Sequence, residues 1–424
     1  MIIYVTQPGD SLYSISKKYD VPLSQLMSDN GAEDLMFLPV GLALIINNDV
    51  QNYTVRPGQS IYSIARAFGL TPEEILTINP QLETPDSIRP GDVIKIPVQT
   101  EKLGKIYANG YAYTSISPQT LRKTLPSLTY ISPFSYEVSA DGSLSALPDR
   151  SVIETARASS VAPMMTLTNL KPDGGFDSEV MEPLVRENSE AFFNNVLSVM
   201  NDKNYYGVNV DFEYIPKSLR EEYNAFLQEF TNKMRENGYY VIAALAPKIR
   251  KDQPGILYEG HDYGAVGAIV DKVILMTYEW GYTYGPPRAV APLNEVERVI
   301  RYAQTEMPKE KIMMSIPNYG YDWTLPYVPG TPAKAISNRA AVMLASRYGA
   351  DIEFDETAKA PYFYYEDDGG AEHIVWFEDA RSIEAKLGLI DKYSLAGVSY
   401  WTVNAYFSQM YIVQNYMFDT IKLV

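Results

Sequence analysis

Apolar and polar side chains follow two periods along this chain, and the two periods predict different elements. Short apolar runs indicate strands, and stretches with apolar residues every three or four positions between them indicate helices. The clearest helix spans 217–237, where Ser218 and Glu221 form a capping box and Gly238 ends the pattern. We read eight runs as strands: 105–113, 128–136, 161–169, 206–214, 239–247, 271–280, 311–321 and 396–403.

Eight strand-then-helix units fit an α/β fold of the closed (β/α)8 type, a TIM barrel, better than an open sheet. We assign residues 102–424 to this barrel domain. The stretch between the seventh and eighth strands is longer than one helix requires. It contains a helical pattern near 337–348 and two aromatic-rich strands within 361–379. We therefore predict a small α+β insertion at 324–378.

The fourth run, "YGVNVDFEYI" (206–215), alternates in an otherwise apolar setting. Because strand side chains alternate between the two faces, Val208, Val210 and Phe212 face one way and the residues between them face the other. Those residues are Asn209, Asp211 and Glu213. In a barrel the apolar series faces the helices and the polar series faces the interior, with Glu213 at the C-terminal end where barrel active sites lie. The alternative is a surface strand with a solvated polar face.

The first hundred residues contain a repeat. The segment from Tyr4 matches the segment from Tyr53, 49 residues later, and the two endings, "PVGLALII" (39–46) and "RPGDVIKI" (89–96), match 50 residues apart. We predict two small, independent βααβ modules at 1–48 and 50–98, followed by a short polar linker at 97–105. The alternative is that their Pro-Gly and Asn positions serve only as turns and caps.

Each copy resembles the LysM domain, which binds glycans that contain N-acetylglucosamine. The resemblance rests on the Pro-Gly turn, the Ser that follows it, and an Asn that opens the second loop. It implies glycan contacts at Gly9, Asp10, Ser11 and Asn30 in the first copy and at Gly58, Gln59, Ser60 and Asn79 in the second. Gln59 stands where Asp is commoner, so the two copies are expected to differ in affinity.

Charge and composition exclude several classes of function. A net charge of −16 argues against nucleic-acid binding, which needs a basic surface. The chain has no Cys, and its only histidines are His261 and His373, so we expect no disulfide, no metal site and no cofactor. Neither a signal peptide nor a membrane-spanning run is expected, so we predict synthesis in the cytoplasm, no membrane partner and a monomer.

The spacing of the two carboxylates on the fourth strand predicts different chemical roles for them. Side chains at i and i+2 on one face are about 7 Å apart and parallel, so both lie on the same side of a bound sugar. Asp211 is therefore badly placed to attack the bond that Glu213 protonates, unlike the opposed carboxylates of ordinary glycosidases. Repulsion and partial burial raise the pKa of Glu213, which suits an acid near neutrality. The nucleophile must come from elsewhere, such as the acetamido oxygen of the substrate.

The motif "GVNVDFE" (207–213) resembles the signature of family 18 glycoside hydrolases, and "MTYEW" (276–280) and "SYW" (399–401) resemble that family's sixth and eighth strands. The resemblance implies a retaining, substrate-assisted mechanism through an oxazolinium intermediate. Glu213 is the acid, Asp211 orients and supports the oxazolinium, Tyr278 hydrogen-bonds the acetamido oxygen, and Asn209 completes the catalytic set. The implied substrate contacts are Trp401, Trp280, Met276, Tyr319, Tyr111 and Asn318.

Some positions depart from the family pattern. Tyr206 and Asn209 stand where chitinases usually have Asp, so Asn209 must replace a charge by hydrogen bonding to Asp211. Glu279 replaces the Asp after Tyr278, and "TLTNL" (166–170) replaces the usual Ser-x-Gly-Gly of the third strand.

The segments "HDYGAVGAIVD" (261–271), "GPPRAVAP" (285–292) and "VWFEDARS" (375–382) resemble spore cortex-lytic N-acetylglucosaminidases that carry LysM domains. This resemblance implies a peptidoglycan hydrolase that acts on spore cortex, is held on the glycan by its LysM modules, and is located at the spore coat or cortex periphery. The alternatives are a chitinase or chito-oligosaccharide hydrolase, and a catalytically weak glycan-binding protein.

Overall fold

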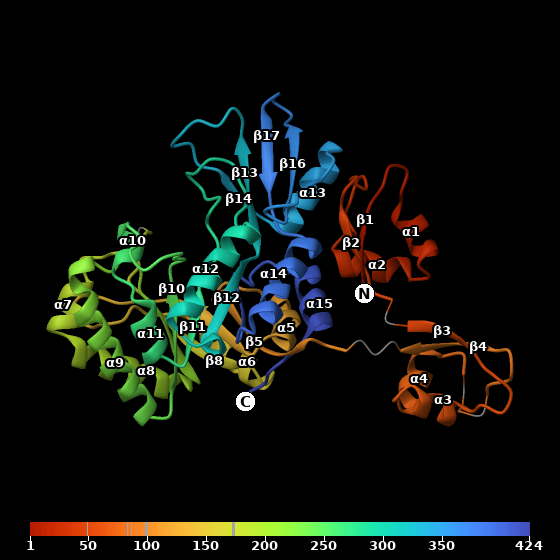
Figure 1. Cartoon of the computed structure of the whole chain (residues 1–424), viewed down its shortest axis with the longest axis horizontal. Coiled ribbons are helices and arrows are strands. Elements are labelled where there is room, and N and C mark those ends of the chain that lie inside the picture. The colour runs from red at the N-terminus through yellow and green to blue at the C-terminus, as the bar shows by residue number, and fades with distance from the viewer. Residues whose placement is uncertain (49, 83, 86, 98–100, 172–173) are drawn as a thin grey trace.

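The computed structural model describes residues 1–48, 50–82, 84–85, 87–97, 101–171 and 174–424, and its largest part is a closed barrel (Figure 1). Parallel pairing runs from β5 round to β18, and β18 pairs back onto β5, which closes the ring. This confirms the predicted (β/α)8 TIM barrel. Its strands are β5 (Gly104–Tyr113), β6 (Tyr130–Phe134), β8 (Ala162–Thr168), β9 (Gly207–Asp211), β10 (Tyr240–Leu245), β11 (Lys272–Leu275), β12 (Ile312–Pro317) and β18 (Gly397–Trp401).

Helices surround this barrel, and the main core lies between helices and strands. Val208 and Val210 of the fourth barrel strand, and Phe212 directly after it, are buried in that core. The helices are α5 (Pro118–Thr124), α6 (Arg150–Ala158), α7 (Met181–Arg186), α8 (Ser189–Lys203), α9 (Arg220–Glu236), α10 (Ile256–Glu259), α11 (Tyr263–Ile269), α12 (Leu293–Glu306), α14 (Ala380–Tyr393) and α15 (Ser408–Met417). Short elements complete the domain: 3-10 turns η1 (Leu125–Ser127), η2 (Lys217–Leu219) and η3 (Lys309–Lys311), and strands β7 (Tyr136–Glu137) and β19 (Phe418–Thr420).

The start of helix α9 differs from the prediction. The capping box of Ser218 and Glu221 is wrong, because Ser218 lies inside the 3-10 turn η2. That turn is closed by the Leu219 amide, which donates to the Pro216 carbonyl at 2.9 Å. The α-helix then begins at Arg220 without a side-chain cap.

The insertion between the last two barrel strands is a five-stranded antiparallel sheet with one helix. It begins earlier than the predicted 324, because β13 already belongs to its sheet and pairs with β14 and β17. Its elements are β13 (Tyr319–Thr324), β14 (Lys334–Ser337), α13 (Asn338–Tyr348), β15 (Glu353–Asp355), β16 (Ala360–Glu366) and β17 (Glu372–Trp376).

The repeat forms two separate βααβ units at the N-terminal end, as predicted. The first module contains β1 (Ile2–Val5), α1 (Leu12–Lys18), α2 (Leu23–Asn30) and β2 (Ala43–Ile46). The second module contains β3 (Val50–Thr54), α3 (Ile61–Ala67), α4 (Pro72–Ile78) and β4 (Val93–Pro97). The linker predicted at 97–105 includes residues 98–100, which lie outside the described residues.

The first module packs against the barrel and its insertion, whereas Figure 1 shows the second module away from both. Leu42, Leu44 and Ile46 of the first module share one buried cluster with Ala341 and Phe363 of the insertion. The prediction of independent modules is therefore wrong for the first copy, because its closing strand buries apolar side chains against another domain.

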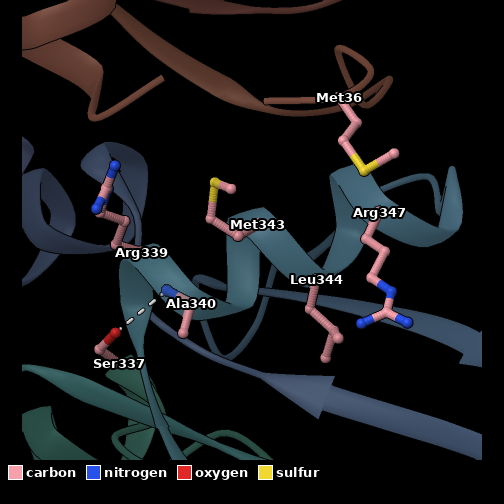
Figure 2. A pocket seen from close by; sticks show the side chains of 7 residues that line it. All are labelled: Met36, Ser337, Arg339, Ala340, Met343, Leu344 and Arg347. Carbon is pink, nitrogen blue, oxygen red and sulfur yellow. Dashed lines mark hydrogen bonds between the residues drawn. The ribbon is translucent and has the colours of Figure 1, made fainter. Parts of the chain in front are cut away.

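A shallow cavity of about 440 Å³ lies along this contact, between Met36 of the first module and helix α13 (Figure 2). Met343 points from the helix toward the module, and Arg339 and Arg347 lie on the same helix. Both arginines are paired, with Asp34 at 2.7 Å and with Asp368 at 2.7 Å.

None of the helices in the described part of the chain is both long and apolar enough to cross a membrane.

Candidate active site

The end of strand β9 carries the predicted acidic residues. Asn209 and Asp211 lie on the strand and are buried. Glu213 follows two residues after the strand ends and is partly exposed. The residues between them pack in the core that faces the helices, so the polar series faces the barrel interior. Asp211 and Glu213 thus lie together at the C-terminal end of the barrel.

The hydrogen bonding of Asn209 differs from the prediction. Its side-chain amide donates to the Tyr111 hydroxyl at 2.7 Å. Asp211 Oδ1 is buried without a hydrogen-bond partner, so it accepts nothing from Asn209. Because Tyr111 lies across the barrel on β5, the Asn209 amide ties two strands together and leaves the charge of Asp211 uncompensated.

Burial controls the proton affinity of both carboxyl groups. Removal from water raises the pKa of Asp211 above its ordinary value. Burial also raises the pKa of Glu213, and the neighbouring charges of Asp211 and Glu279 raise it further. Since like charges this close resist ionising together, the two groups titrate as a pair. The geometry therefore favours a state in which the pair retains a proton near neutral pH.

A cavity of about 580 Å³ opens beside Glu213. The predicted residues Met276, Tyr278 and Trp280 line it together with Glu213. Burial raises the pKa of the Tyr278 hydroxyl well above its ordinary range, so this hydroxyl stays protonated and can donate a hydrogen bond.

Sequence analysis missed most of the aromatic lining of this cavity. Each missed residue follows a different barrel strand, from β8 to β11, so aromatic residues in the loops after successive strands were the available signal. They are Phe176, Tyr214, Tyr258 and Tyr282.

Glu279 connects the cavity with the insertion. Its carboxylate accepts hydrogen bonds from the hydroxyls of Tyr319 and Tyr321, both on strand β13. Loss of solvent around Glu279 raises its pKa, which these two bonds partly offset. Tyr319 therefore reaches the site through Glu279, and it is not among the residues that line the cavity.

Trp401 lies at the end of β18 and is partly exposed. Its ring packs edge-on against Phe134 and Tyr111, with centroids 4.7 and 5.2 Å apart. Tyr111 itself is only 1% exposed, so its ring contacts Trp401 from within the barrel core. The predicted direct contact between Tyr111 and substrate is wrong because the Trp401 and Asn209 side chains occupy its surroundings.

Asn318 is also a structural residue and not the predicted substrate contact. It is buried, and its amide donates to the carbonyls of Thr402 at 2.8 Å and Ala405 at 2.7 Å. These bonds hold the loop that follows Trp401.

Two of the predicted glycan contacts in the modules, Asn30 and Asn79, also differ from the prediction. Asn30 and Asn79 are buried, and each amide donates to the carbonyl four residues earlier and to the closing strand. Each side-chain oxygen also accepts a backbone amide of that strand. Because these bonds use the whole carboxamide inside the module, neither side chain is available to a glycan.

The remaining module residues lie on the surface around one turn. Gly9 and Gly58 adopt left-handed backbone angles and are exposed. Ser11 and Ser60 cap helices α1 and α3 through their side chains. Asp10 and Gln59 each accept hydrogen bonds from the backbone amide three residues earlier and from a Tyr hydroxyl.

Comparison with known proteins gives two family matches. The chain matches the glycosyl hydrolases of family 18 over residues 173–405. It matches the LysM domain over residues 4–47 and 53–97.

Similar proteins cover nearly the whole chain. The chain is 36% identical over 433 residues to a cortical fragment-lytic enzyme of Bacillus anthracis, with 98% of each sequence covered. It is 41% identical over 307 residues to a cortical fragment-lytic enzyme of Bacillus subtilis, covering 72% of this chain and 71% of that one. The crystal structure of the spore cortex-lytic enzyme SleL of Bacillus megaterium superposes with a TM-score of 0.85 at 36% identity, covering 100% of this chain and 99% of that one.

Proposed function

Because this chain belongs to the glycosyl hydrolases of family 18 and carries two LysM domains, we propose that it hydrolyses spore cortex peptidoglycan at the β-1,4 bond that follows N-acetylglucosamine. The observation that carries the proposal is the position of Glu213. It borders an aromatic-lined cavity, and its neighbour Asp211 is buried two residues earlier, at the end of β9. The names of the similar Bacillus proteins support the cortex as substrate and a location in the spore.

In the first step Glu213 donates its proton to the glycosidic oxygen, and the bond to the leaving sugar breaks. Its raised pKa keeps it protonated for this task. The acetamido oxygen of the substrate attacks the anomeric carbon, because Asp211 lies on the same strand face as Glu213 and cannot reach the opposite side of the sugar.

The resulting oxazolinium carries a positive charge. Asp211, buried and without a hydrogen-bond partner on Oδ1, is the carboxylate available to stabilise that charge. The Tyr278 hydroxyl donates to the acetamido group and fixes its direction. Glu213, now deprotonated, takes a proton from water as the water oxygen attacks the anomeric carbon. The bond from that carbon to the acetamido oxygen breaks, which restores the acetamido group and gives overall retention of configuration.

Two aromatic side chains provide apolar surfaces for sugars. Trp280 lines the cavity, and Trp401 is held edge-on by its neighbours at the end of β18. Pyranose rings present apolar faces that pack well on such rings.

The proposal is tested with solubilised cortex fragments incubated with wild type, Glu213→Gln and Glu236→Gln. Glu236 is an exposed residue at the end of α9, so its substitution makes the same change in charge outside the site. Removal of a general acid lowers the rate by a factor of about 10² to 10⁴. We expect new reducing N-acetylglucosamine ends from wild type and Glu236→Gln, and almost none from Glu213→Gln.

Two results would refute the proposal: reducing muramic ends in place of N-acetylglucosamine ends, or equal products from wild type and Glu213→Gln. Chitin oligosaccharides in a parallel reaction distinguish a preference for cortex from a preference for chitin. The activity should fall as the pH rises through the raised pKa of Glu213, because the proton donor is then lost.

A further inference from the structure

The backbone around Glu213 lies beyond the last strand pairing of the barrel. Strand β8 ends at Thr168 and β9 ends at Asp211, and these two residues form the last pair between the strands. Glu213 therefore needs contacts other than the β8–β9 ladder to fix its main chain.

Asn169, the residue after β8, supplies such contacts with its side chain. Its Oδ1 accepts the Glu213 backbone amide at 2.9 Å, and its Nδ2 donates to the Glu213 carbonyl at 2.9 Å. One carboxamide thus satisfies both backbone groups of Glu213, as a paired strand residue does. Asn169 is fully buried, so water does not compete for these bonds.

The same side chain reaches a wall of the cavity. Asn169 Nδ2 also donates to the carbonyl of Asp177 at 3.0 Å, and the Asn169 carbonyl accepts the Asp177 amide. Asp177 follows Phe176, which lines the cavity and packs against the ring of Tyr214 at 5.9 Å. Asn169 therefore connects Glu213 with a segment that contacts the cavity.

The preceding carbonyl is held from another direction. The Phe212 carbonyl lies 2.9 Å from His261 Nε2, which must carry the proton because a carbonyl only accepts. Burial lowers the pKa of His261 to about 4, so the ring is neutral near pH 7 and donates through this nitrogen. Together the two side chains fix three consecutive backbone groups, from the Phe212 carbonyl to the Glu213 carbonyl.

We propose that Asn169 is a positioning residue for Glu213, its carboxamide taking the place of a strand partner for the backbone that carries the acid. This proposal rests on the proposed catalytic role of Glu213. It gives a function to the "TLTNL" segment, which departs from the usual third-strand motif. The required groups are an acceptor and a donor on one short planar side chain, which Asn has and Asp at neutral pH lacks.

The test compares Asn169→Ala and Asn169→Asp with wild type in steady-state hydrolysis of soluble cortex fragments across pH. A small misplacement of a catalytic group costs up to about 10²-fold in rate. We expect kcat to fall about tenfold to a hundredfold in both variants, with KM within about twofold of wild type.

The two variants should move the basic limb of the pH profile in opposite directions. The added negative charge of Asn169→Asp raises the pKa of Glu213 further and moves the limb to higher pH. Asn169→Ala releases the Glu213 backbone, so the Glu213 carboxyl group becomes more hydrated. Hydration favours the charged form, which lowers the pKa of Glu213 and moves the limb to lower pH.

Asn188 provides a matched control. Its amide donates to the backbone carbonyls of Ala140 at 3.0 Å and Pro183 at 3.4 Å, and it does not line the cavity. Asn188→Ala should lower the melting temperature less than Asn169→Ala, because Asn188 is only partly buried, and should leave kcat and the pH profile unchanged. A kcat of Asn169→Ala equal to that of wild type, or a loss shared by Asn188→Ala, would overturn the proposal.

A crystal structure of Asn169→Ala provides a readout that does not depend on activity. We expect a displaced main chain at 212–214, and a main chain that superposes on wild type would refute the positioning role. Glu213→Gln is assayed alongside. If that variant retains full activity the proposed function fails, whereas the crystal structure still decides whether Asn169 fixes this backbone.

Discussion

The two N-terminal modules have the same internal construction but different surroundings. In both, a Ser caps the first helix and a buried Asn ties the second helix to the closing strand. The core of the second module contains only its own residues. The first module instead shares its buried clusters with the insertion and the barrel. The residues shared by the two copies thus determine the fold of each module. The few positions at which the copies differ determine what each module packs against.

The closing strands contain the decisive difference. Ile45 of β2 is fully buried in the main barrel core, and the matching residue of β4 is Lys95, which is partly exposed. Leu42 is buried against the insertion, and its counterpart is Asp92. An apolar residue at each position creates a second buried face, which is why only the first module is part of the structural unit around the active site.

This difference has a consequence for binding to an insoluble glycan. Packing fixes the first module relative to Glu213, so a glycan bound there has a set distance to the active site. Between the second module and the first the structure describes one ion pair, Lys95 with Asp20 at 3.8 Å, and both side chains are exposed. Exposed pairs of this kind contribute little.

The largest expected effect comes from converting Ile45 into its counterpart. Ile45→Lys places an unpaired charge in the main core, and we expect a loss of about 4 kcal/mol in the free energy of unfolding. The reciprocal change, Lys95→Ile, should alter that free energy by less than about 0.5 kcal/mol, because the residue is partly exposed. Urea denaturation of both variants measures this, and equal midpoints for Ile45→Lys and wild type would show that the first module does not pack as described.

A smaller loss is expected at Gln409 on helix α15. Its Nε2 donates to Asn30 Oδ1 at 2.9 Å and to the Ala43 carbonyl at 2.8 Å, and its Oε1 accepts the Ala380 amide. Gln409→Ala leaves buried polar groups without partners, which costs about 2 to 3 kcal/mol. Hydrogen exchange should show faster exchange in β2 and no change in β4.

Gln414→Ala is the matched control for this experiment. Gln414 is buried on the same helix, and it bonds to the Ser127 carbonyl and the Tyr400 hydroxyl within the barrel domain. It should destabilise the protein without a selective effect on β2. Equal protection of β2 in Gln409→Ala and Gln414→Ala would contradict a specific role of Gln409 at the contact.

The ion pair at the edge of the contact should contribute less. Arg339 on α13 binds Asp34 of the first module at 2.7 Å, and both side chains are largely exposed. Arg339→Ala should therefore cost about 0.5 kcal/mol, and the cost should vanish in 1 M salt because exposed charges are screened. Arg347→Ala, which breaks a pair inside the insertion, should cost as much without changing exchange in the first module. If Arg339→Ala lowers the free energy of unfolding equally in 1 M salt, the contribution of Arg339 comes from packing of its side chain and not from the ion pair.

Local patterns predicted the barrel because eight runs rich in apolar residues alternate with stretches of helical period. The run at 311–321 shows the limit of such patterns. It continues in sequence but divides into β12 and β13 around Asn318, whose backbone amide donates to the Trp401 carbonyl at 2.8 Å. That partner is 83 positions away, so no local period indicates the break.

The active site likewise has one part that local sequence predicts and one part that it does not. The alternation in "GVNVDFE" predicted which side chains face the interior, since a strand has only two faces. Tyr111, the partner of Asn209, lies on β5, and Asn169, the partner of Glu213, follows β8, so only the assembled barrel reveals these contacts. The docking of the first module lies between these two cases. The alignment of the two copies shows an apolar Ile45 where the second copy has Lys95, but it does not show which surface Ile45 contacts.

The smallest expected effect concerns the turn that begins each module. Hydrogen bonds from the Gln7 amide and the Tyr4 hydroxyl lower the pKa of Asp10. A lowered pKa in the folded state means that this stabilisation is present above the pKa of an unfolded Asp, about 3.9, and is lost as the pH falls through the folded value. Gln59 accepts the equivalent bonds from Arg56 and Tyr53 without a charge, so its turn should not respond to acid.

Amide chemical shifts report this difference directly. We expect the Gln7 amide to titrate with a midpoint below that of a free Asp and the Arg56 amide to stay constant. Gln59→Asp should make the Arg56 amide titrate, and Asp10→Gln should abolish the transition at Gln7. Because both turns are exposed, the accompanying change in stability is small. A Gln7 midpoint at the ordinary Asp value would mean that the turn does not favour the charged carboxylate, and the two copies would then differ only in what they pack against.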